Sequence, residues 1–234
     1  MPRWLSRVQI PSSAPCDGAG PPRPAPSRSR REVPVPSQPP ASDRPAVARA
    51  VADLIRALGL DPRAEPELRE TPARVADLYA ELLAGLDPAA LPELATFPHA
   101  RGAGDELVIV RDLPFHSLCV HHLVPFFGHA HIAYLPGERI IGISGAARLL
   151  DHYARRPQLQ ERLTAQIADH LERQVAPRGV AVVLEARHLC MEMRGIRKPG
   201  LVETRVVRGA LAEPRWAAAL PARRGGVPAA DAER

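Results

Sequence analysis

The segment that most restricts the fold is residues 179–195, GVAVVLEARHLCMEMRG. Its first half is rich in β-branched and aliphatic residues, so the whole segment is predicted to be one long strand. Side chains alternate between the two faces of a strand. One face would then carry polar or reactive groups, namely His188, Cys190, Glu192 and Arg194. The other would carry hydrophobic side chains that suit a core, namely Leu189, Met191 and Met193. A face with imidazole, thiol and guanidinium groups is typical of the wall of a polar pocket.

Two helices are predicted before the first strand, at residues 46–59 and 70–86. In the second helix, Thr71 suits the N-terminal cap, Pro72 the first turn and Gly85 the end. The preceding helix ends on Gly59. This part of the chain is therefore predicted to be an N-terminal helical pair.

The other segments alternate between strand-like and helix-like patterns. In chain order they are predicted as strands 105–115 and 128–135, helices 145–156 and 157–175, and strand 201–211. In the last helix, Pro157 opens the first turn, and apolar residues recur every four positions at Leu159, Leu163, Ile167 and Leu171. This order predicts an α+β fold in which an antiparallel sheet carries helices on one face.

Residues 1–45 differ in composition from the remainder of the chain. They contain twelve of the 27 prolines and carry seven arginines against three acidic residues. Such a segment buries too little apolar surface to offset the entropy of ordering, so it is predicted to be disordered. It is interpreted as a species-specific tail, or as a start codon assigned too far upstream, with a basic docking arm as the alternative. Residues 213–234 are predicted to be a partly disordered C-terminal tail.

Charge and cysteine content exclude several classes of protein. Of the net charge of +5, the first 45 residues supply +4, so the folded part has no broad nucleic-acid-binding signature. No apolar run approaches the roughly 18 residues that span a bilayer, and the N-terminus lacks the apolar stretch of a secretory signal. Three cysteines do not make a disulfide framework. The chain is therefore predicted to be cytoplasmic, with no nucleic-acid or membrane partner.

A metal site is suggested by Cys119 and His122. A Cys-x-x-His turn offers two zinc ligands from one loop, and no second pair of this kind follows. Cys190 is the remaining cysteine outside the tail, so the three residues would leave one coordination position open, as in catalytic zinc sites. The alternative is two buried thiols and a surface histidine. His121 and His188 would flank the metal as candidates for general acid and base.

Two weaker patterns suit nucleotide recognition. Gln160 and Glu161 lie near a helix start, where a carboxylate can accept two hydrogen bonds from a guanine edge, although a solvated helix face has the same spacing. Ser144 and Arg148 open another helix, where phosphate binding is favoured, although serine is also a common cap.

Taken together, residues 46–211 resemble the GTP cyclohydrolase I family. The matching segments are the ETPARVADLY helix, CVHH at 119–122 where the family has C-E-H-H, GISGAARLLDHYARRPQLQERLT at 142–164, and EARHLCMEMRGIRKPG at 185–200. The resemblance implies that residues 46–212 form a catalytic domain with the tunnelling fold (T-fold). It also implies a homodecamer whose active sites lie between subunits.

The resemblance also implies a role for each matching residue. The zinc ligands would be Cys119, His122 and Cys190. The pocket histidines would be His121 and His188, with His188 as the main proton-transfer residue. The guanine edge would be held by Gln160 and Glu161. The triphosphate would face Ser144, Arg148 and Arg194. The implied reaction opens the imidazole ring of GTP, releases formate and closes a new ring to give 7,8-dihydroneopterin triphosphate, the first step of pterin synthesis for folate or tetrahydrobiopterin.

Three positions depart from the family motifs, and one of them is Val207, which stands where the family has a serine in its final strand. Val120 replaces the glutamate of C-E-H-H, and Gly145 replaces a lysine that would favour phosphate; Arg208 is a candidate replacement for that cation. These changes leave two alternatives open. The first alternative to an ordinary GTP cyclohydrolase I is a divergent paralogue that uses another purine nucleotide or stops at the ring-opened formamide. The second is a catalytically weak nucleotide-binding regulatory subunit.

Overall fold

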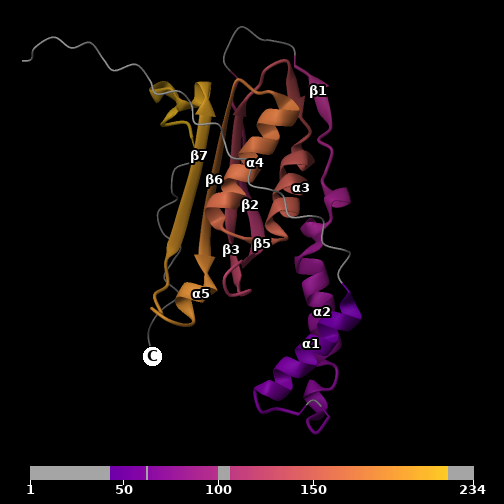
Figure 1. Cartoon of the computed structure of the whole chain (residues 1–234). Helices are drawn as coiled ribbons and strands as arrows, with labels where there is room; N and C mark the ends of the chain where they lie inside the picture. Colours follow the sequence, from indigo (N-terminus) through magenta and orange to yellow (C-terminus); the bar gives the residue numbers. More distant parts are fainter. Residues whose placement is uncertain (1–42, 62, 100–105, 221–234) are drawn as a thin grey trace, which may run out of the picture. The chain divides into compact units, whose positions relative to one another are not determined.

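The structure is a computed structural model that describes residues 43–61, 63–99 and 106–220. Its centre is a five-stranded sheet of order β5–β2–β3–β6–β7 (Figure 1). The long strands are β2 (Val108–Cys119), β3 (Pro125–Leu135), β6 (Gly179–His188) and β7 (Leu201–Gly209). Adjacent long strands run antiparallel, which confirms the predicted sheet. Most of the predicted N-terminal extension, residues 1–42, and residues 221–234 of the tail lie outside the described residues.

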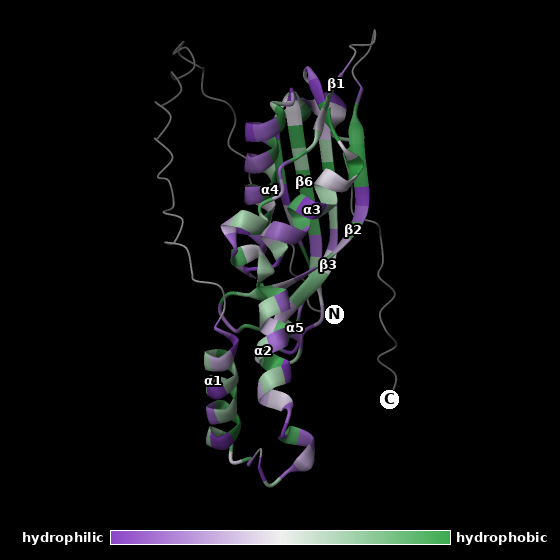
Figure 2. Cartoon of the chain, turned by 90° about the vertical axis from the view of Figure 1, so that its right-hand side faces the viewer, coloured by the Kyte–Doolittle hydropathy of each residue, from purple (hydrophilic) through white to green (hydrophobic). Residues whose placement is uncertain are grey.

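Two helices, α3 (Ile143–Ala154) and α4 (Gln160–Val175), cover one face of this sheet (Figure 1). The apolar stripe of α4 is buried against the sheet through Leu163, Ile167 and Leu171. Figure 2 shows hydrophobic strands behind these helices and hydrophilic residues on the outer side of α4. The α+β class is therefore confirmed, and the arrangement is that of the tunnelling fold. None of the described helices is long and apolar enough to cross a bilayer.

The predicted long strand at 179–195 is wrong in its second half. Strand β6 ends at His188, and Leu189–Glu192 form a single helical turn, α5. Leucine, methionine and glutamate favour helix, whereas the β-branched residues that favour strand are confined to the first half. The two-face alternation therefore does not extend beyond His188, and Met193, expected in the core, is 63% exposed.

The predicted helix at 157–175 begins three residues late. Pro157–Gln158 form a short strand, β5, which pairs in parallel with Leu118 and Cys119 at the end of β2. Strand β2 continues beyond its predicted end at residue 115, and this added length gives β5 its partner. Leu159, predicted to share the buried stripe, is instead the half-exposed N-cap of α4.

The N-terminal pair consists of α1 (Arg44–Ala57) and α2 (Thr71–Leu82). Helix α1 begins two residues before the boundary expected at residue 46, where the Asp43 side chain accepts a hydrogen bond from the Ala46 amide at 3.0 Å. Thr71 is the first residue of α2 rather than its cap, which is Glu70.

Gly85 does not end α2, which stops at Leu82. It packs directly against α3, because a Cβ atom at Gly85 would lie 2.0 Å from the His152 carbonyl oxygen. The close approach of the two backbones therefore requires glycine at this position.

Short elements complete the chain. A two-stranded antiparallel sheet is formed by β1 (Thr96–Pro98) and β4 (Arg139–Ile141). Single 3₁₀ turns are formed by Pro66–Leu68, Ala84–Leu86, Pro88–Ala90, Ala210–Ala212 and Pro214–Trp216. Leu211 and Leu220 pack with Leu135 and two alanines in a second hydrophobic cluster. The start of the predicted C-terminal tail thus contacts the sheet.

Buried histidines make stability depend on pH, with His152 of α3 giving the largest effect. Burial, aided by the nearby Arg156 guanidinium, lowers the pKa of His152 to about 4. An unfolded histidine has a pKa near 6.5, so between about pH 6.5 and 4 the unfolded chain binds a proton that the folded chain does not. Stability attributable to His152 is therefore present above pH 6.5 and lost as the pH falls toward 4, by up to about 3 kcal/mol.

We expect His152→Gln to flatten this dependence, because glutamine does not titrate. Urea unfolding at pH 7, 6 and 5 would measure it, with the unsubstituted chain losing stability more steeply than the variant. Burial also lowers the pKa values of His131 and His170, so some slope will remain. Parallel pH curves for the two proteins would contradict the prediction.

Candidate metal centre and active site

Three side chains from two distant segments of the sequence meet at one end of the sheet. Ligand atoms of Cys119, His122 and Cys190 all lie within 4.8 Å of one another, and the Cys119 Sγ–His122 Nδ1 distance is 3.7 Å. Tetrahedral zinc with Zn–S near 2.3 Å and Zn–N near 2.0–2.1 Å requires ligand atoms roughly 3.5–3.8 Å apart. The three residues therefore fit a zinc ion with little movement, and they leave one position for water or substrate.

The turn between β2 and β3 supplies two of these groups. Two backbone hydrogen bonds of Cys119 close the turn. Its amide donates to the Val124 carbonyl at 2.9 Å, and its carbonyl accepts from the Leu123 amide at 2.8 Å. Leu123 has a positive φ of 53°. The Val120 amide donates to the Gln158 carbonyl of β5 at 3.0 Å, and the Val120 side chain is 37% exposed. The backbone rather than the Val120 side chain thus holds the turn in place.

The third group comes from α5. Cys190 is half-buried, and burial, together with hydrogen bonding and proximity to Cys119, raises the pKa of its thiol. The raised pKa disfavours the thiolate form of Cys190 in the absence of a cation, and a divalent metal would reverse this by binding the thiolate. The nearby Arg194, which follows α5 and is exposed, acts in the opposite direction on the Cys190 pKa.

His188 is fixed beside this group by two contacts that the sequence did not reveal. Its ring stacks on Phe126 at 4.7 Å between centroids and 2° between planes, because the two residues are cross-strand partners. Its Nε2 lies 2.7 Å from Gln160 Oε1. Burial lowers the pKa of His188, and the nearby Glu161 carboxylate partly opposes this effect.

Gln160 itself is only 2% exposed, and internal hydrogen bonds occupy its amide group. Its Nε2 donates to the Leu184 carbonyl at 3.0 Å and the Val202 carbonyl at 2.8 Å, and lies 3.1 Å from Thr204 Oγ1. These acceptors orient the amide so that Oε1 faces His188. His188 must then carry its proton on Nε2, which leaves Nδ1 as the nitrogen that accepts one.

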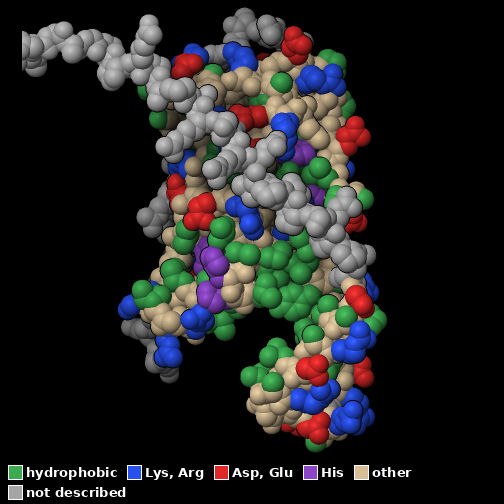
Figure 3. Space-filling model, in the orientation of Figure 1, with side chains coloured by type: hydrophobic (Ala, Val, Ile, Leu, Met, Phe, Trp, Pro, Cys, Tyr) green, Lys and Arg blue, Asp and Glu red, His purple; other side chains and the backbone are tan. Residues whose placement is uncertain are grey.

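His121 and Glu161 are exposed around the same end of the sheet. His121 Nδ1 lies 4.0 Å from Cys119 Sγ, although His121 is not one of the three residues of the metal group. Figure 3 shows histidine side chains gathered on the surface near α5, next to a hydrophobic area. Apart from the three predicted ligands, the structure therefore brings together His121, His188, Gln160, Glu161 and Arg194.

Ser144 and Arg148 do not join this group within one chain. Both are exposed in the first half of α3, whereas the last residue of that helix, Ala154, accepts a hydrogen bond from Ser117 Oγ at 2.7 Å, close to Cys119. With a rise of 1.5 Å per residue, Ser144 is about 15 Å from that end of the helix. Gly145 is buried, and a Cβ there would lie 3.3 Å from Leu94.

Arg208, suggested as a replacement cation, does not reach the site. Its Nη1 atom pairs with Asp169 and Glu172 of α4, at 2.5 Å in each case. Arg208 lies opposite Val180, at the end of β6 remote from His188. It stabilises the contact between α4 and β7, where two carboxylates already neutralise its charge.

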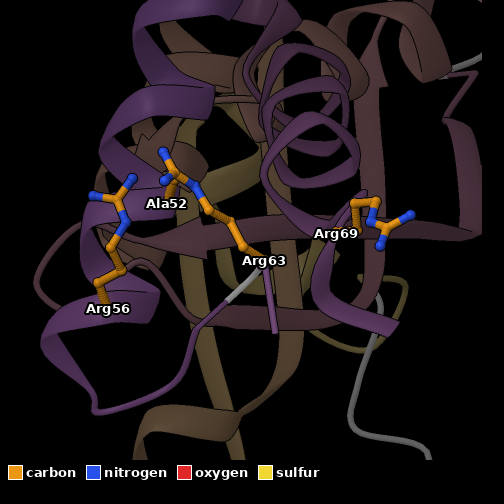
Figure 4. Close-up of a pocket in the computed structure, with 4 residues that line it drawn as sticks. All are labelled: Ala52, Arg56, Arg63 and Arg69. Atoms are coloured by element: carbon orange, nitrogen blue, oxygen red, sulfur yellow. The ribbon is translucent and has the colours of Figure 1, made fainter. Parts of the chain in front are cut away.

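A separate hollow of about 370 Å³ lies on the helical hairpin and is lined by Ala52, Arg56, Arg63 and Arg69 (Figure 4). Arg56 is paired with Asp53 at 2.5 Å, and Figure 4 shows the Arg69 side chain pointing away from the other two arginines. None of these residues belongs to the predicted site. The hollow is therefore distinct from the metal group.

Comparison with known proteins gives matches to one enzyme family. The family model described as GTP cyclohydrolase I matches residues 47–220. The chain is 53% identical over 175 residues to GTP cyclohydrolase 1 of Mycobacterium ulcerans, covering 72% of this chain and 84% of the relative. It is 51% identical over 174 residues to GTP cyclohydrolase 1 of Thermobifida fusca, covering 73% and 83%. A solved structure of the archaeosine synthase QueF-Like in the apo form aligns with a TM-score of 0.35 and 19% identity, over 42% of this chain and 91% of that chain. The match to the family over most of the described residues shows that this chain is a member of the GTP cyclohydrolase I family of enzymes.

Proposed function

We propose that the chain is a zinc-dependent GTP cyclohydrolase I that opens the imidazole ring of GTP, releases formate and forms 7,8-dihydroneopterin triphosphate. The observation that carries this proposal is the meeting of Cys119, His122 and Cys190 within 4.8 Å of one another. Family membership supports the substrate, and the Cys-His-Cys donor set supports zinc. This reaction would be the first step of pterin synthesis for folate or tetrahydrobiopterin, and it would take place in the cytoplasm.

The protein side chains have separate tasks around the metal. Zinc bound by the three ligands would supply Lewis acidity and a water whose pKa is lowered to about 7. His188, with its Nε2–H held by Gln160, accepts and returns protons at Nδ1, and its stacking on Phe126 keeps the ring in one orientation. His121 is a second histidine available to the substrate.

Substrate binding would use an acidic and a basic side chain. We assign Glu161 to the N–H groups of guanine, because a carboxylate accepts two parallel hydrogen bonds from that edge. Gln160 lies beside Glu161 in the first turn of α4. Its buried amide would form part of the wall of the guanine-binding pocket. Arg194 is the phosphate contact from the same chain as the metal ligands.

Ser144 and Arg148 complete the triphosphate site from a second copy of the chain. Within one chain, Ser144 lies about 15 Å and Arg148 about 9 Å along α3 from the helix end that is near the metal group, which supports this arrangement. We therefore propose a homo-oligomer, a decamer by family resemblance, whose sites lie between subunits.

The test is to incubate zinc-loaded protein with GTP and to follow formate and the mass and fluorescence of the pterin product. We expect equimolar formate and 7,8-dihydroneopterin triphosphate. Absence of formate would contradict the proposal. Faster turnover of another purine nucleotide, or accumulation of the ring-opened formamide, would favour the divergent paralogue, and GTP binding without turnover would favour the regulatory subunit.

A further inference from the structure

Two charged residues enclose the segment that carries both His188 and Cys190. Arg187 is the penultimate residue of β6, and Glu192 is the last residue of α5. Their side chains form two parallel hydrogen bonds, Nε to Oε1 at 2.9 Å and Nη2 to Oε2 at 2.5 Å. Such bidentate pairs fix orientation as well as distance. The pair thus closes a short loop around the proton-transfer histidine and the third metal ligand.

Both partners are held by further contacts. The Glu192 side chain is only 10% exposed, and hydrogen bonds from Arg187 and from the Gly200 backbone lower the pKa of its carboxyl group. The Arg187 guanidinium lies 5.9 Å from the centre of the Phe127 ring, its cross-strand neighbour on β3. The ion pair is therefore anchored to the sheet on one side and to the segment after α5 on the other.

The α5 turn needs such support because it has little of its own. It is four residues long, and its helical backbone is closed by the Met193 amide donating to the Leu189 carbonyl at 2.9 Å. One turn of helix does not persist in water without tertiary contacts. The residues that follow are exposed, as shown by Met193 at 63% and Ile196 at 68%.

We propose that the Arg187–Glu192 pair is a clamp that holds the α5 turn against the end of the sheet and keeps Cys190 within ligand distance of Cys119 and His122. Arg187 and Glu192 are positioning residues, since they act on the metal through Cys190. The proposal rests on the proposed function, because it concerns the zinc site of that reaction. Its direct consequence is slow release of zinc.

The test measures zinc release from the zinc-loaded full-length chain after mixing with a chromogenic chelator. Glu192→Gln and Arg187→Met are each expected to release zinc about tenfold faster, since loss of groups that orient metal ligands costs 10- to 100-fold in metal affinity. The double variant is expected to release zinc little faster than either single variant, because both substitutions remove the same contact.

Glu203→Gln is the matched control. It breaks another Arg–Glu pair of the same sheet, in which Arg205 Nη2 lies 3.1 Å from Glu203 Oε1, at a position outside the ligand segment. Its zinc release is expected to stay within about twofold of that of the unsubstituted chain, as for a surface ion pair of small energetic effect. Melting of the zinc-free proteins provides the second readout, because a merely structural role would lower the melting temperature without a selective effect on zinc.

The outcomes separate the two proposals. If the unsubstituted chain binds zinc and both clamp variants release it at the unsubstituted rate, the clamp is wrong and the proposed function stands. The same holds if Glu203→Gln accelerates release as much as Glu192→Gln does. If the unsubstituted chain binds no zinc, the proposed function fails and the clamp fails with it.

Discussion

Asparagine in place of His122 is expected to remove zinc from the chain, whereas asparagine in place of His121 is expected to leave zinc bound and slow the reaction. His122 is one of the three residues whose ligand atoms meet within 4.8 Å, and His121 is not. A two-cysteine site without its histidine lacks the three protein ligands of a catalytic zinc centre, so zinc should fall from about one to under about 0.1 per chain. Loss of a proton-transferring or substrate-contacting histidine should lower kcat roughly 100-fold.

Metal content by atomic emission and formate release from GTP would measure the two effects separately. The neighbouring substitutions act as controls for each other, because they make the same chemical change one residue apart in the same exposed turn. A third variant, Leu123→Gly, tests the turn alone, since glycine readily adopts the positive φ of 53° found there. Equal zinc loss in the His121 and His122 variants would contradict the assignment of the ligand.

Mixing two inactive variants is expected to restore activity if the site is shared between subunits. His188→Ala damages the part of the site that lies with the metal, and Arg148→Ala damages the proposed phosphate side, which lies about 9 Å along α3 from the helix end near the metal group. In randomly mixed oligomers from equal co-expression, about a quarter of the sites would combine an intact metal side with an intact phosphate side. Activity should therefore rise from near zero to about a quarter of that of the unsubstituted protein.

The control is to co-express His188→Ala with Cys190→Ala. Both lesions then fall on the same side of the site, so every site keeps one of them and no activity should return. Formate release by the purified mixtures would be compared with that of each variant alone. Full activity of the Arg148 variant alone, or no gain in the His188/Arg148 mixture, would show that Arg148 does not act across a subunit boundary.

The sequence predicted the fold class and the Cys-His-Cys group that could hold a metal because both depend on local signals. Strand and helix patterns were strong between residues 105 and 211, and Cys-x-x-His with one further cysteine left few possible ligand sets. Alternation placed Cys190 on a strand face with His188, and the structure instead brings it to the metal group by a helical turn. Cys190 was thus correctly predicted to lie near Cys119 and His122, although it lies on a helical turn and not on the predicted strand.

The contacts that orient His188 could not be predicted in this way. Stacking on Phe126 depends on the register between β3 and β6, which no local pattern specifies. The hydrogen bond from His188 to Gln160 depends on how α4 packs over two strands. The family resemblance implied that Gln160 holds the guanine edge. Its side chain is instead buried, and its amide donates to backbone carbonyls of β6 and β7, contacts that have no signature in the sequence.

The buried amide of Gln160 also restricts how this site can evolve. Glutamate at this position would turn a carboxylate toward the carbonyls of Leu184 and Val202, so the change would destabilise the packing of α4 at the same time as it altered the proton on His188. The packing of α4 and the orientation of His188 thus depend on the same side chain. Changes in substrate preference are expected to accumulate at exposed positions such as Val120 and Arg194, where a mutation alters what the site binds without weakening the interior.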